Sequence, residues 1–423
     1  MFFLGIDFGT SGVRATIINN QKKEIYSCKT DIPKPLLNGG TVTQDPNIWW
    51  NAFINICRNL KNNFNINTIS KISVNGTSGT VMLTNNDGIP LHDAIMYNDT
   101  SAIEESELVE KVSSNHPIVS SQGNALVRVL KLIKILKNIK SFKILHQADW
   151  IVGKITNNYS ISDENNSLKL GYDCINKTWP DWISNLPIEI KNFPIIYTPG
   201  EFVNNLNNKE LIDIGFKKST KVIAGTTDSI AAFVATGANE IGQAVTSIGS
   251  TLVVKYIGEK PIFNKEYGIY SHKLGNNWLA GGASNVGGTI LSKLFNGDIE
   301  SLSSKINPYK LTGLKYYPLS KNGERFPYND PNKQPILEPK PEKRIDFFQA
   351  VLEGITYVEK LSYERLNEIG GGYPSEVFTV GGGSNNENWN KIRSKILNLN
   401  LVKPLSSEAS FGSALIAGGF LKK

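Results

Sequence analysis

Two aspartates stand where an apolar run gives way to a polar turn. Asp7 lies in the opening stretch FFLGIDFGTSGVRATII, and Asp228 follows the run KVIAGTT and precedes an apolar run that predicts a helix. At the end of a strand, a carboxylate faces open space rather than core. It can then accept a proton from a hydroxyl group or bind a divalent cation through that cation's water shell. The alternatives are a surface Asp in an ordinary hairpin for Asp7 and an N-capping Asp for Asp228.

The turn that follows Asp7 contains Gly9, Thr10, Ser11 and Gly12. Its glycines permit a positive φ or the close approach of a ligand, and its hydroxyl and free N–H groups can converge on one anion. A phosphate fits such a turn, and Asp7 beside it indicates Mg²⁺ and a nucleotide. The same composition is also typical of an ordinary turn.

Two further glycine-containing turns lie in the second half of the chain. The stretch AVTSIGSTLVVKYIG, which includes residues 249–251, resembles the opening hairpin and suggests an internal duplication with one phosphate-binding turn in each half. The triple glycine at residues 381–383 leaves room for a flat ring or a phosphate against the backbone, and Asn386 and Trp389 follow it. Each of these signals is weak on its own.

The first half is predicted to begin with a meander of strands at residues 2–7, 13–18 and 24–30. Asp45 and Pro46 supply an N-cap and a first helical position for a helix whose apolar residues recur at helical spacing. That helix is expected to cover one face of the sheet.

A strand predicted at residues 71–75 leads into the turn NGTSGT, and a later apolar run, AIMY, ends just before Asp99. Strand ends therefore place Ser78, Thr80 and Asp99 at one edge of the sheet. We expect this to be the edge that carries Asp7.

Residues 124–158 are predicted to be helical, with an apolar stripe that packs in the core. His146 and Asp149 have i, i+3 spacing within this segment, which is more typical of a structural hydrogen bond than of a metal site. The stretch SDENNSLKLGYD predicts a loop that lines a polar pocket, and HKLGNNWLAGGASNVGG predicts a loop that enters a helix. A long amphipathic helix is expected from Ile345 to Ile369.

Length and composition limit the classes of protein. A chain of 423 residues that is 40% hydrophobic suits two domains of roughly 200 residues each. The net charge is +7 and the pI is about 9.0, but lysines and arginines are scattered among acids, so we expect no nucleic-acid partner. An odd number of widely spaced cysteines, Cys28, Cys57 and Cys174, predicts a reducing compartment. No leader and no apolar run of membrane-spanning length is visible, so the prediction is a cytoplasmic protein without a membrane partner.

The motifs together carry a specific resemblance. No GxxxxGK[ST] or GxGxxG motif occurs, which disfavours a P-loop or Rossmann protein, and no HExxH motif occurs either. The stretches GIDFGTSGVRA, AGTTDSIAAF, SIGSTL, NGERFPYNDP, GGGSNNENW and FGSALIAGG follow in this order over nearly the whole chain. In this combination the sequence resembles the FGGY carbohydrate kinases of the actin-like ATPase superfamily.

The resemblance implies an α/β fold of two actin-like (ribonuclease H-like) domains with a duplicated core and an interdomain cleft. It also implies ATP and Mg²⁺ as cofactors and transfer of the γ-phosphoryl group to a sugar hydroxyl. We expect an N-terminal domain at residues 1–219 with the sugar site and a C-terminal domain at residues 220–423 with the ATP site. A small-molecule sugar and ATP are the expected partners, and the protein is expected to be a monomer or a homodimer.

The resemblance also assigns roles by motif. Asp228 matches the family's catalytic base, which accepts the hydroxyl proton while the alcohol attacks phosphorus in line. Asp7 is implied to orient hydrated Mg²⁺ and to contact the sugar. The residues implied to bind ATP are Thr10 and Ser11 in the first phosphate turn, Gly249, Ser250 and Thr251 in the second, and Gly382, Gly383, Asn386 and Trp389 around adenosine.

Departures from the family pattern bear on the substrate. Xylulokinase-like members tend to carry Met-His where this chain has Ser78-Gly79-Thr80, and the Arg of their Trp-Asn-Asp-x-Arg run is missing after Asp99. The chain looks most like the small D-ribulose kinases related to xylulose kinases of photosynthetic organisms. The expected substrate is D-ribulose, which Ser78 helps to bind, and D-xylulose is the close alternative. A sugar- or ATP-binding sensor with little transfer activity is a third possibility, although retention of Asp228 argues against it.

Overall fold

The computed structural model divides the chain into two compact units, each described here by itself. Unit 1 contains Met1–Ala235 and Glu408–Lys423, and unit 2 contains Thr236–Ser407. The residues that the structure describes are 1–113, 119, 124–137, 139 and 141–421.

This division differs from the expected boundary between residues 219 and 220. β13 (Lys221–Ile223) follows that boundary, yet it pairs in parallel with β6 (Ile69–Gly76) of unit 1. The chain also returns to unit 1 at Glu408. Pairing between strands that are far apart in sequence therefore decides which unit a segment belongs to.

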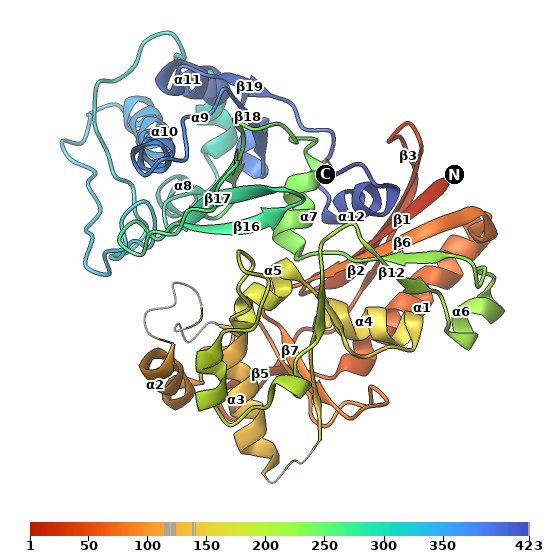
Figure 1. Cartoon of the computed structure of the whole chain (residues 1–423). Coiled ribbons are helices and arrows are strands. Elements are labelled where there is room, and N and C mark those ends of the chain that lie inside the picture. The colour runs from red at the N-terminus through yellow and green to blue at the C-terminus, as the bar shows by residue number, and fades with distance from the viewer. Residues whose placement is uncertain (114–118, 120–123, 138, 140, 422–423) are drawn as a thin grey trace. The chain divides into compact units, whose positions relative to one another are not determined.

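The main sheet of unit 1 has the strand order β12-β13-β6-β1-β2-β3 (Figure 1). β1 pairs with β2 in antiparallel and with β6 in parallel orientation. The predicted strands at residues 2–7, 13–18, 24–30 and 71–75 are confirmed as β1, β2, β3 and β6. The strands of this sheet are β1 (Phe2–Phe8), β2 (Gly12–Asn19), β3 (Glu24–Asp31), β6, β12 (Phe202–Asn205) and β13.

Alternation along β1 places its side chains on two faces of the sheet. One face packs against α1 (Pro46–Asn63) in a hydrophobic core. This core includes Leu4, Ile6 and Phe8 of β1 and Trp49 and Phe53 of α1. On the other face, a Cβ at Gly5 would lie 2.0 Å from the backbone oxygen of Ser410 in α12 (Ala409–Gly418). Glycine thus lets α12 lie directly against β1. Asp7 shares this face with Gly5 and so emerges beside α12.

The start of α1 is confirmed as predicted. The Asp45 side chain accepts a hydrogen bond from the Asn47 N–H group at 2.9 Å, and Pro46 is the first helical residue. The other helices of unit 1 are α2 (Ile103–Val112), α3 (Ala125–Leu136), α4 (Gln147–Thr156), α5 (Glu164–Ser167), α6 (Lys209–Ile214), α7 (Asp228–Ala235) and the 3₁₀ turns at Ile66–Thr68, Leu168–Leu170, Asp181–Asn185 and Ile190–Asn192.

The prediction of one helical segment at residues 124–158 is wrong in its middle. α3 and α4 are separated by a strand, β9 (Lys143–His146), which pairs antiparallel with β7 (Val81–Thr84) in a second sheet. An apolar run of this length suits a strand or a helix equally, and only its distant partner decides. The remaining strands of unit 1 are β4 (Leu36–Asn38), β5 (Thr41–Gln44), β8 (Ala94–Ile95), β10 (Ile161–Asp163) and β11 (Ile195–Tyr197).

The sheet of unit 2 repeats the central arrangement of unit 1. Its strand order is β16-β17-β15-β14-β18-β19, with β14 antiparallel to β15 and parallel to β18. β14 thus corresponds to β1, β15 to β2 and β18 to β6, as expected for a duplicated core. The strands are β14 (Gln243–Ile248), β15 (Leu252–Gly258), β16 (Tyr270–Leu274), β17 (Asn277–Ser284), β18 (Glu376–Val380) and β19 (Asn400–Val402).

The stretch HKLGNNWLAGGASNVGG enters a helix at Gly288, as predicted, but most of it is not a loop. It contributes to the antiparallel hairpin of β16 and β17 instead. A Cβ at Gly281 would lie 2.0 Å from the Val254 oxygen, and one at Gly282 would lie 2.4 Å from the Phe326 ring. The glycines therefore serve close packing inside a strand, which composition alone cannot distinguish from a turn.

The helices of unit 2 cover its sheet, and the long helix predicted at residues 345–369 is confirmed as α10. The helices are α8 (Gly288–Phe295), α9 (Ile299–Lys305), α10 (Arg344–Glu368), α11 (Glu387–Leu397) and the 3₁₀ turn at Gly382–Asn385. The triple glycine at residues 381–383 lies between β18 and α11 and leads into the 3₁₀ turn.

α7 and α12 lie side by side in unit 1 (Figure 1). A Cβ at Gly412 of α12 would lie 1.8 Å from the Ala231 oxygen of α7, so only glycine permits this contact. A buried hydrogen bond of 2.8 Å also joins the hydroxyl groups of Thr16 in β2 and Ser410 in α12. The segment after residue 407 is therefore an integral part of unit 1.

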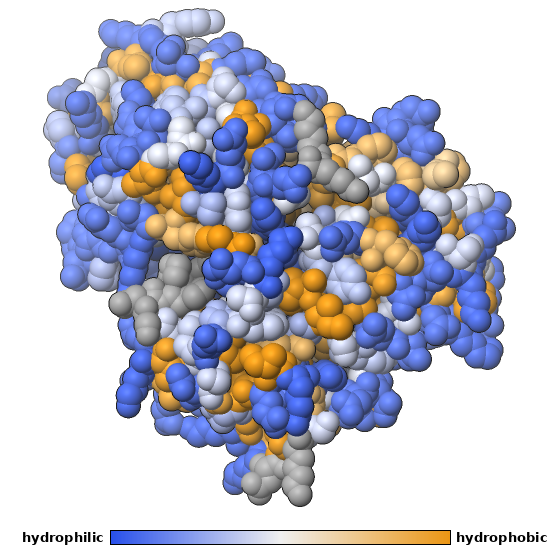
Figure 2. Space-filling model, viewed as in Figure 1, coloured by the Kyte–Doolittle hydropathy of each residue, from blue (hydrophilic) through white to orange (hydrophobic). Residues whose placement is uncertain are grey.

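Hydrophilic side chains predominate on the face that Figure 2 shows, with hydrophobic ones in separate patches. Exposed large hydrophobic residues such as Leu36, Ile195 and Tyr309 come from different elements. No helix among the described residues is long and apolar enough to cross a membrane.

Candidate active site

Asp7 is a buried carboxylate at the end of β1, with 5% of its surface exposed. Its Oδ1 accepts a hydrogen bond from Asn75 Nδ2 at 2.8 Å, and Asn75 Oδ1 accepts one from the Ser413 hydroxyl of α12. Burial, and next the charge of Asp228, raises the pKa of Asp7 to about 7. Asp7 therefore exchanges a proton near neutral pH, and its ionised form gains from a nearby cation.

One such cation is Arg14, which faces Asp7 across the β1–β2 pair. Arg14 Nη1 lies 3.8 Å from Asp7 Oδ2, and Arg14 Nε lies 3.5 Å from Glu408 Oε2. Arg14 lowers the pKa of Asp7, whereas Glu408 raises it. The protonation of Asp7 thus depends on Glu408, the residue at which the chain returns to unit 1.

Asp228 is the first residue of α7, as predicted from the sequence. It is half-buried, and its Oδ1 accepts a hydrogen bond from the Ser229 N–H group at 2.7 Å. The preceding residue, Thr227, forms a parallel backbone bridge with Gly76 at the end of β6. Asp228 and Asp7 consequently interact electrostatically within unit 1.

The stretch SDENNSLKLGYD is not a loop throughout, because it contains the end of β10 and the helix α5. Asp163 caps α5 by accepting hydrogen bonds from the Asn165 and Asn166 N–H groups at 2.9 and 3.1 Å. Asn165 Nδ2 donates to Thr226 Oγ1 at 2.9 Å, so α5 supports the turn before Asp228. Burial, and next Asp149, raises the pKa of Asp163 to about 7.

Ser78 lies in the turn after β6, and its Oγ is buried without a hydrogen-bond partner among the described residues. The backbone of the next residue is held by Arg128, whose Nη1 donates to the Gly79 oxygen at 2.9 Å. Burial lowers the pKa of Arg128 to about 10, and Asp99 opposes that effect. The backbone of the turn is thus held in place by the buried guanidinium group of Arg128.

Thr80 and Asp99 have internal roles instead of an open edge position. The Thr80 hydroxyl bonds to that of Thr77 at 2.7 Å and accepts the Tyr97 N–H group at 3.1 Å. Asp99 is fully buried and accepts the Val42 N–H group at 2.7 Å. The expectation that they lie at the sheet edge that carries Asp7 is wrong, because Thr80 precedes β7 and Asp99 follows β8 in the second sheet, whereas Asp7 lies in β1 of the main sheet.

The pair of His146 and Asp149 is structural, as predicted. The His146 Nδ1 atom lies 3.0 Å from Asp149 Oδ2, which also accepts the His146 N–H group at 2.9 Å. The pair caps the start of α4.

The turn between β1 and β2 closes on itself through a hydrogen bond of 2.9 Å from the Gly9 N–H group to the Gly12 oxygen. Ser11 is exposed, and the Thr10 hydroxyl donates to the Tyr97 hydroxyl at 3.3 Å. The turn has the predicted form, and phosphate binding by it stays a prediction.

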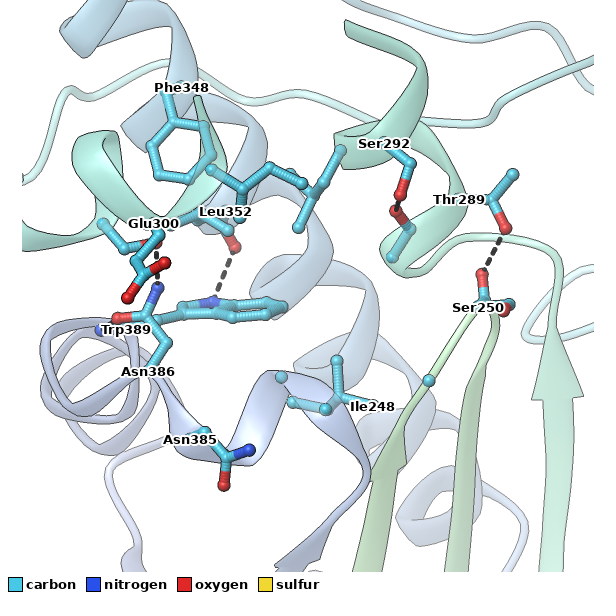
Figure 3. A pocket seen from close by; sticks show the side chains of 17 residues that line it. Ile248, Ser250, Thr289, Ser292, Glu300, Phe348, Leu352, Asn385, Asn386 and Trp389 are labelled. Atoms are coloured by element: carbon cyan, nitrogen blue, oxygen red, sulfur yellow. Dashed lines mark hydrogen bonds between the residues drawn. The ribbon is translucent and has the colours of Figure 1, made fainter. Parts of the chain in front are cut away.

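Unit 2 contains a cavity of about 880 Å³ (Figure 3). This volume is within the range of pockets that hold nucleotide-sized ligands. Its lining residues are Ile248, Gly249, Ser250, Gly288, Thr289, Leu291, Ser292, Ile299, Glu300, Ser303, Phe348, Leu352, Gly382, Gly383, Asn385, Asn386 and Trp389. All of the predicted ATP-binding residues of unit 2 lie in this list except Thr251.

Trp389 forms one wall of the cavity, and three hydrogen bonds hold it in place. Its Nε1 donates to Thr356 Oγ1 at 2.9 Å and to the Leu352 oxygen at 3.1 Å, and its backbone N–H donates to Asn386 Oδ1 at 3.0 Å. A Cβ at Gly383 would lie 2.9 Å from the Trp389 ring, whereas one at Gly382 would meet no atom within 4 Å. Gly383 thus packs against the ring, and Gly382 faces open space.

Asn386 is the N-cap of α11, and its Nδ2 donates to Ser303 Oγ of α9 at 2.9 Å. In Figure 3, Asn386 and Glu300 lie toward one end of the cavity and Ser250 and Thr289 toward the other. The Thr289 N–H and hydroxyl groups both donate to the Ser250 oxygen, at 3.1 and 2.8 Å. The second turn is therefore joined to the start of α8.

The cavity also contains residues of α8, α9 and α10 that were not predicted from the sequence. They include Thr289, Ser292, Glu300, Ser303 and Phe348. No motif marks these positions, and only for α10 did an amphipathic pattern indicate that one face of the helix is covered.

The comparisons with known proteins agree with this architecture. Residues 2–235 match the N-terminal domain of the FGGY family of carbohydrate kinases, and residues 244–419 match its C-terminal domain. A xylulose kinase from Staphylococcus xylosus is 24% identical over 98% of this chain and 90% of its own length. A gluconokinase from Bacillus subtilis is 22% identical over 99% of this chain and 87% of its own length.

Solved structures have the same fold. A protein described as a xyloylose kinase from Brucella ovis matches 99% of this chain and 90% of its own, with a TM-score of 0.87 and 23% identity. A Plasmodium falciparum glycerol kinase with ADP matches 99% of this chain and 89% of its own, with a TM-score of 0.86 and 18% identity.

The chain belongs to the FGGY family of carbohydrate kinases. It is therefore a phosphotransferase with a sugar acceptor, built from two actin-like domains. Enzymes of this family use ATP.

Proposed function

We propose that this kinase transfers the γ-phosphoryl group of ATP to the terminal hydroxyl of D-ribulose and forms D-ribulose 5-phosphate. Support comes from the stretch Ser78-Gly79-Thr80, where xylulokinase-like sequences tend to carry Met-His. D-Xylulose is the second candidate, because relatives that match nearly the whole chain are named xylulose kinases.

The position of Asp228 carries the proposal. Its carboxylate stands at the start of α7, half-buried, next in sequence to a turn that α5 and β6 hold in place. Such a carboxylate can accept the proton of an attacking hydroxyl group, which contributes about 10²–10⁴ in rate. The N-capping alternative explains neither the electrostatic coupling to Asp7 nor the support by two other elements.

Asp7 is the proposed residue for hydrated Mg²⁺. The described residues contain no group of three or more His, Cys, Asp or Glu side chains that could hold a metal ion directly. One buried carboxylate with a raised pKa fits Mg²⁺ that keeps most of its waters and binds through ATP phosphates. When bound, Mg²⁺ neutralises charge that develops on the phosphate oxygens.

The cavity of unit 2 is the proposed adenosine site. Gly382, Gly383, Asn386 and Trp389 line it, as the resemblance implies, and Gly249 and Ser250 are the proposed phosphate turn. Thr10 and Ser11 are the proposed phosphate turn of unit 1. Thr251 does not line the cavity, but its backbone oxygen accepts a hydrogen bond from the Gly249 N–H group at 3.1 Å within the proposed turn.

A coupled ADP-release assay over pentuloses, hexuloses, polyols and gluconate tests the substrate. D-Ribulose should have the highest kcat/KM, and a higher value for D-xylulose would favour the second candidate. Asp228→Asn should lower kcat by about 10²–10⁴ and leave ATP binding nearly unchanged. Asp45→Asn is the matched control, since Asp45 is an exposed N-cap in the same unit. A kcat of Asp228→Asn close to that of the control would remove Asp228 as the base.

A further inference from the structure

Several buried polar groups without partners gather around the end of β6. Among the described residues, Ser78 Oγ, Gln147 Nε2 and Thr227 Oγ1 are buried and accept or donate no hydrogen bond. Native proteins contain few such groups, because a buried polar atom that has lost water without gaining a partner is destabilising. Their occurrence together needs a local explanation.

The three groups come from segments that contact one another. The Thr77 N–H and hydroxyl groups donate to Gln147 Oε1 at 3.0 and 2.9 Å, and the Gln147 N–H group donates to the Thr80 oxygen at 3.2 Å. Gly76 forms the backbone bridge to Thr227, which directly precedes Asp228. The segments that carry the unpartnered groups therefore adjoin one another, and one of them leads directly into the proposed base.

The orientation of the Gln147 amide follows from its partners. A backbone N–H group can only donate, so the atom that faces Thr77 must be the oxygen Oε1. Gln147 is 1% exposed, and a Cβ at Gly76 would lie 3.0 Å from its Oε1, so the side chain has little freedom. The remaining atom, Nε2, is a fixed donor of two hydrogen bonds.

We infer that Gln147 Nε2 donates a hydrogen bond to an oxygen of the acceptor sugar and that the Ser78 and Thr227 hydroxyl groups bind its neighbouring hydroxyls. The inference rests on the proposed sugar kinase function. A polyhydroxy ketone offers closely spaced oxygens. Its carbonyl oxygen can only accept hydrogen bonds, and Gln147 Nε2 can only donate them, so the two groups are complementary. Ser78 and Asp228 are each only half-buried, so the cluster reaches the surface of unit 1.

Gln147→Glu tests the donor separately from the support of the turn. The introduced carboxyl keeps an oxygen for Thr77, but its ionised form has no hydrogen to donate. We expect the KM for the sugar to rise about tenfold, which is within the range of one hydrogen bond, while the KM for ATP changes less than about twofold. The increase should be larger at about pH 8.5 than at about pH 6.5, because a protonated carboxyl can still donate.

Gln44→Glu is the matched control. Gln44 is a buried glutamine of the same unit, but both ends of its amide are used: Nε2 donates to the Pro33 oxygen and Oε1 accepts from Trp49 Nε1, each at 2.7 Å. It should lower stability without a pH-dependent change in sugar KM. A sugar KM of Gln147→Glu within about twofold of wild type at both pH values would overturn the inference.

Calorimetric binding of deoxy analogues to the ATP-free protein identifies the contacted oxygen. Wild-type protein should bind the analogue that lacks this oxygen about tenfold more weakly than it binds the parent sugar. The Gln147→Glu variant should bind that analogue and the parent sugar with equal affinity. Equal losses in both proteins for every analogue would contradict the contact. If wild type phosphorylates no sugar at all, the proposed function fails instead, and calorimetric sugar binding still decides the role of Gln147.

Discussion

The Arg14 guanidinium group reaches Asp7 across the β1–β2 pair, with Nη1 3.8 Å from Oδ2. On its other side it contacts the Glu408 carboxylate. Because these carboxylates compete for one cation, Glu408 weakens the hold of Arg14 on Asp7.

Glu408→Gln should therefore lower the pKa of Asp7 from its raised value. The variant removes one negative charge that repels the ionised Asp7 carboxylate, and Glu408 no longer competes with Asp7 for Arg14. We expect the acidic limb of the kcat/KM profile to move to lower pH, so that activity at about pH 6 rises relative to activity at about pH 8. Glu368→Gln, which removes the exposed partner of Arg365 in unit 2, is the control. A shift to higher pH would contradict this relationship.

Gly382 and Gly383 should respond differently to substitution. Gly383→Ala places a Cβ 2.5 Å from Ile248 Cγ2 and 2.9 Å from the Trp389 ring, and should destabilise unit 2 by about 1–3 kcal/mol. Gly382→Val meets no atom within 4 Å of its Cβ, so the Tm should be unchanged while the KM for ATP rises. Thermal unfolding and ATP titration measure both effects. Equal Tm values with equal ATP affinities would disprove the packing difference.

Ser78→Ala should raise the KM for the sugar more than the KM for ATP, because it removes a hydroxyl that only a ligand can pair. Ser73→Ala is a matched control: its Oγ is also buried without a partner among the described residues, but it lies in the middle of β6. That variant should keep wild-type kinetics. Initial-rate kinetics for both substrates separate the two serines, and identical profiles would exclude Ser78 from sugar binding.

Asp163 should make the protein less stable as pH rises. The folded protein keeps this carboxyl protonated up to about pH 7, whereas the unfolded chain releases the proton near the ordinary Asp pKa of 3.8. The free energy of unfolding therefore falls between these values, by up to about 4 kcal/mol. Asp163→Asn should remove that loss and become more stable relative to wild type from about pH 5 to about pH 8. Urea unfolding at both pH values tests this, with the exposed Asp213→Asn as the control.

The parts of the fold that the sequence predicted correctly have local signals. Asp45 and Pro46 mark the start of α1, and alternating or continuous apolar residues mark β1, β2 and β6. The turn before Asp228 was also recognisable, since a strand, a polar turn and a helix follow within a few residues. Motif order then indicated the family, although no single motif is decisive.

The parts that escaped prediction depend on distant partners. β9 lies inside an apolar run that looks helical until β7 pairs with it. Asp99 looks like a strand-end acid until the Val42 N–H group is seen to bond to it. Glu300 and Phe348 reach the cavity only because α9 and α10 pack around it. Such contacts are set by tertiary packing, and the local sequence does not indicate which distant segment a residue will contact.

The return of the chain to unit 1 has a consequence for protein synthesis. Unit 2 is one uninterrupted segment, and all of its strands have been made before residue 408 is translated. β1 is translated before unit 2, but its Gly5 and Asp7 face is covered by α12, which is translated after unit 2. β1 is therefore made long before the helix that covers it, and the surroundings of Asp7 are completed only after unit 2 has been synthesised.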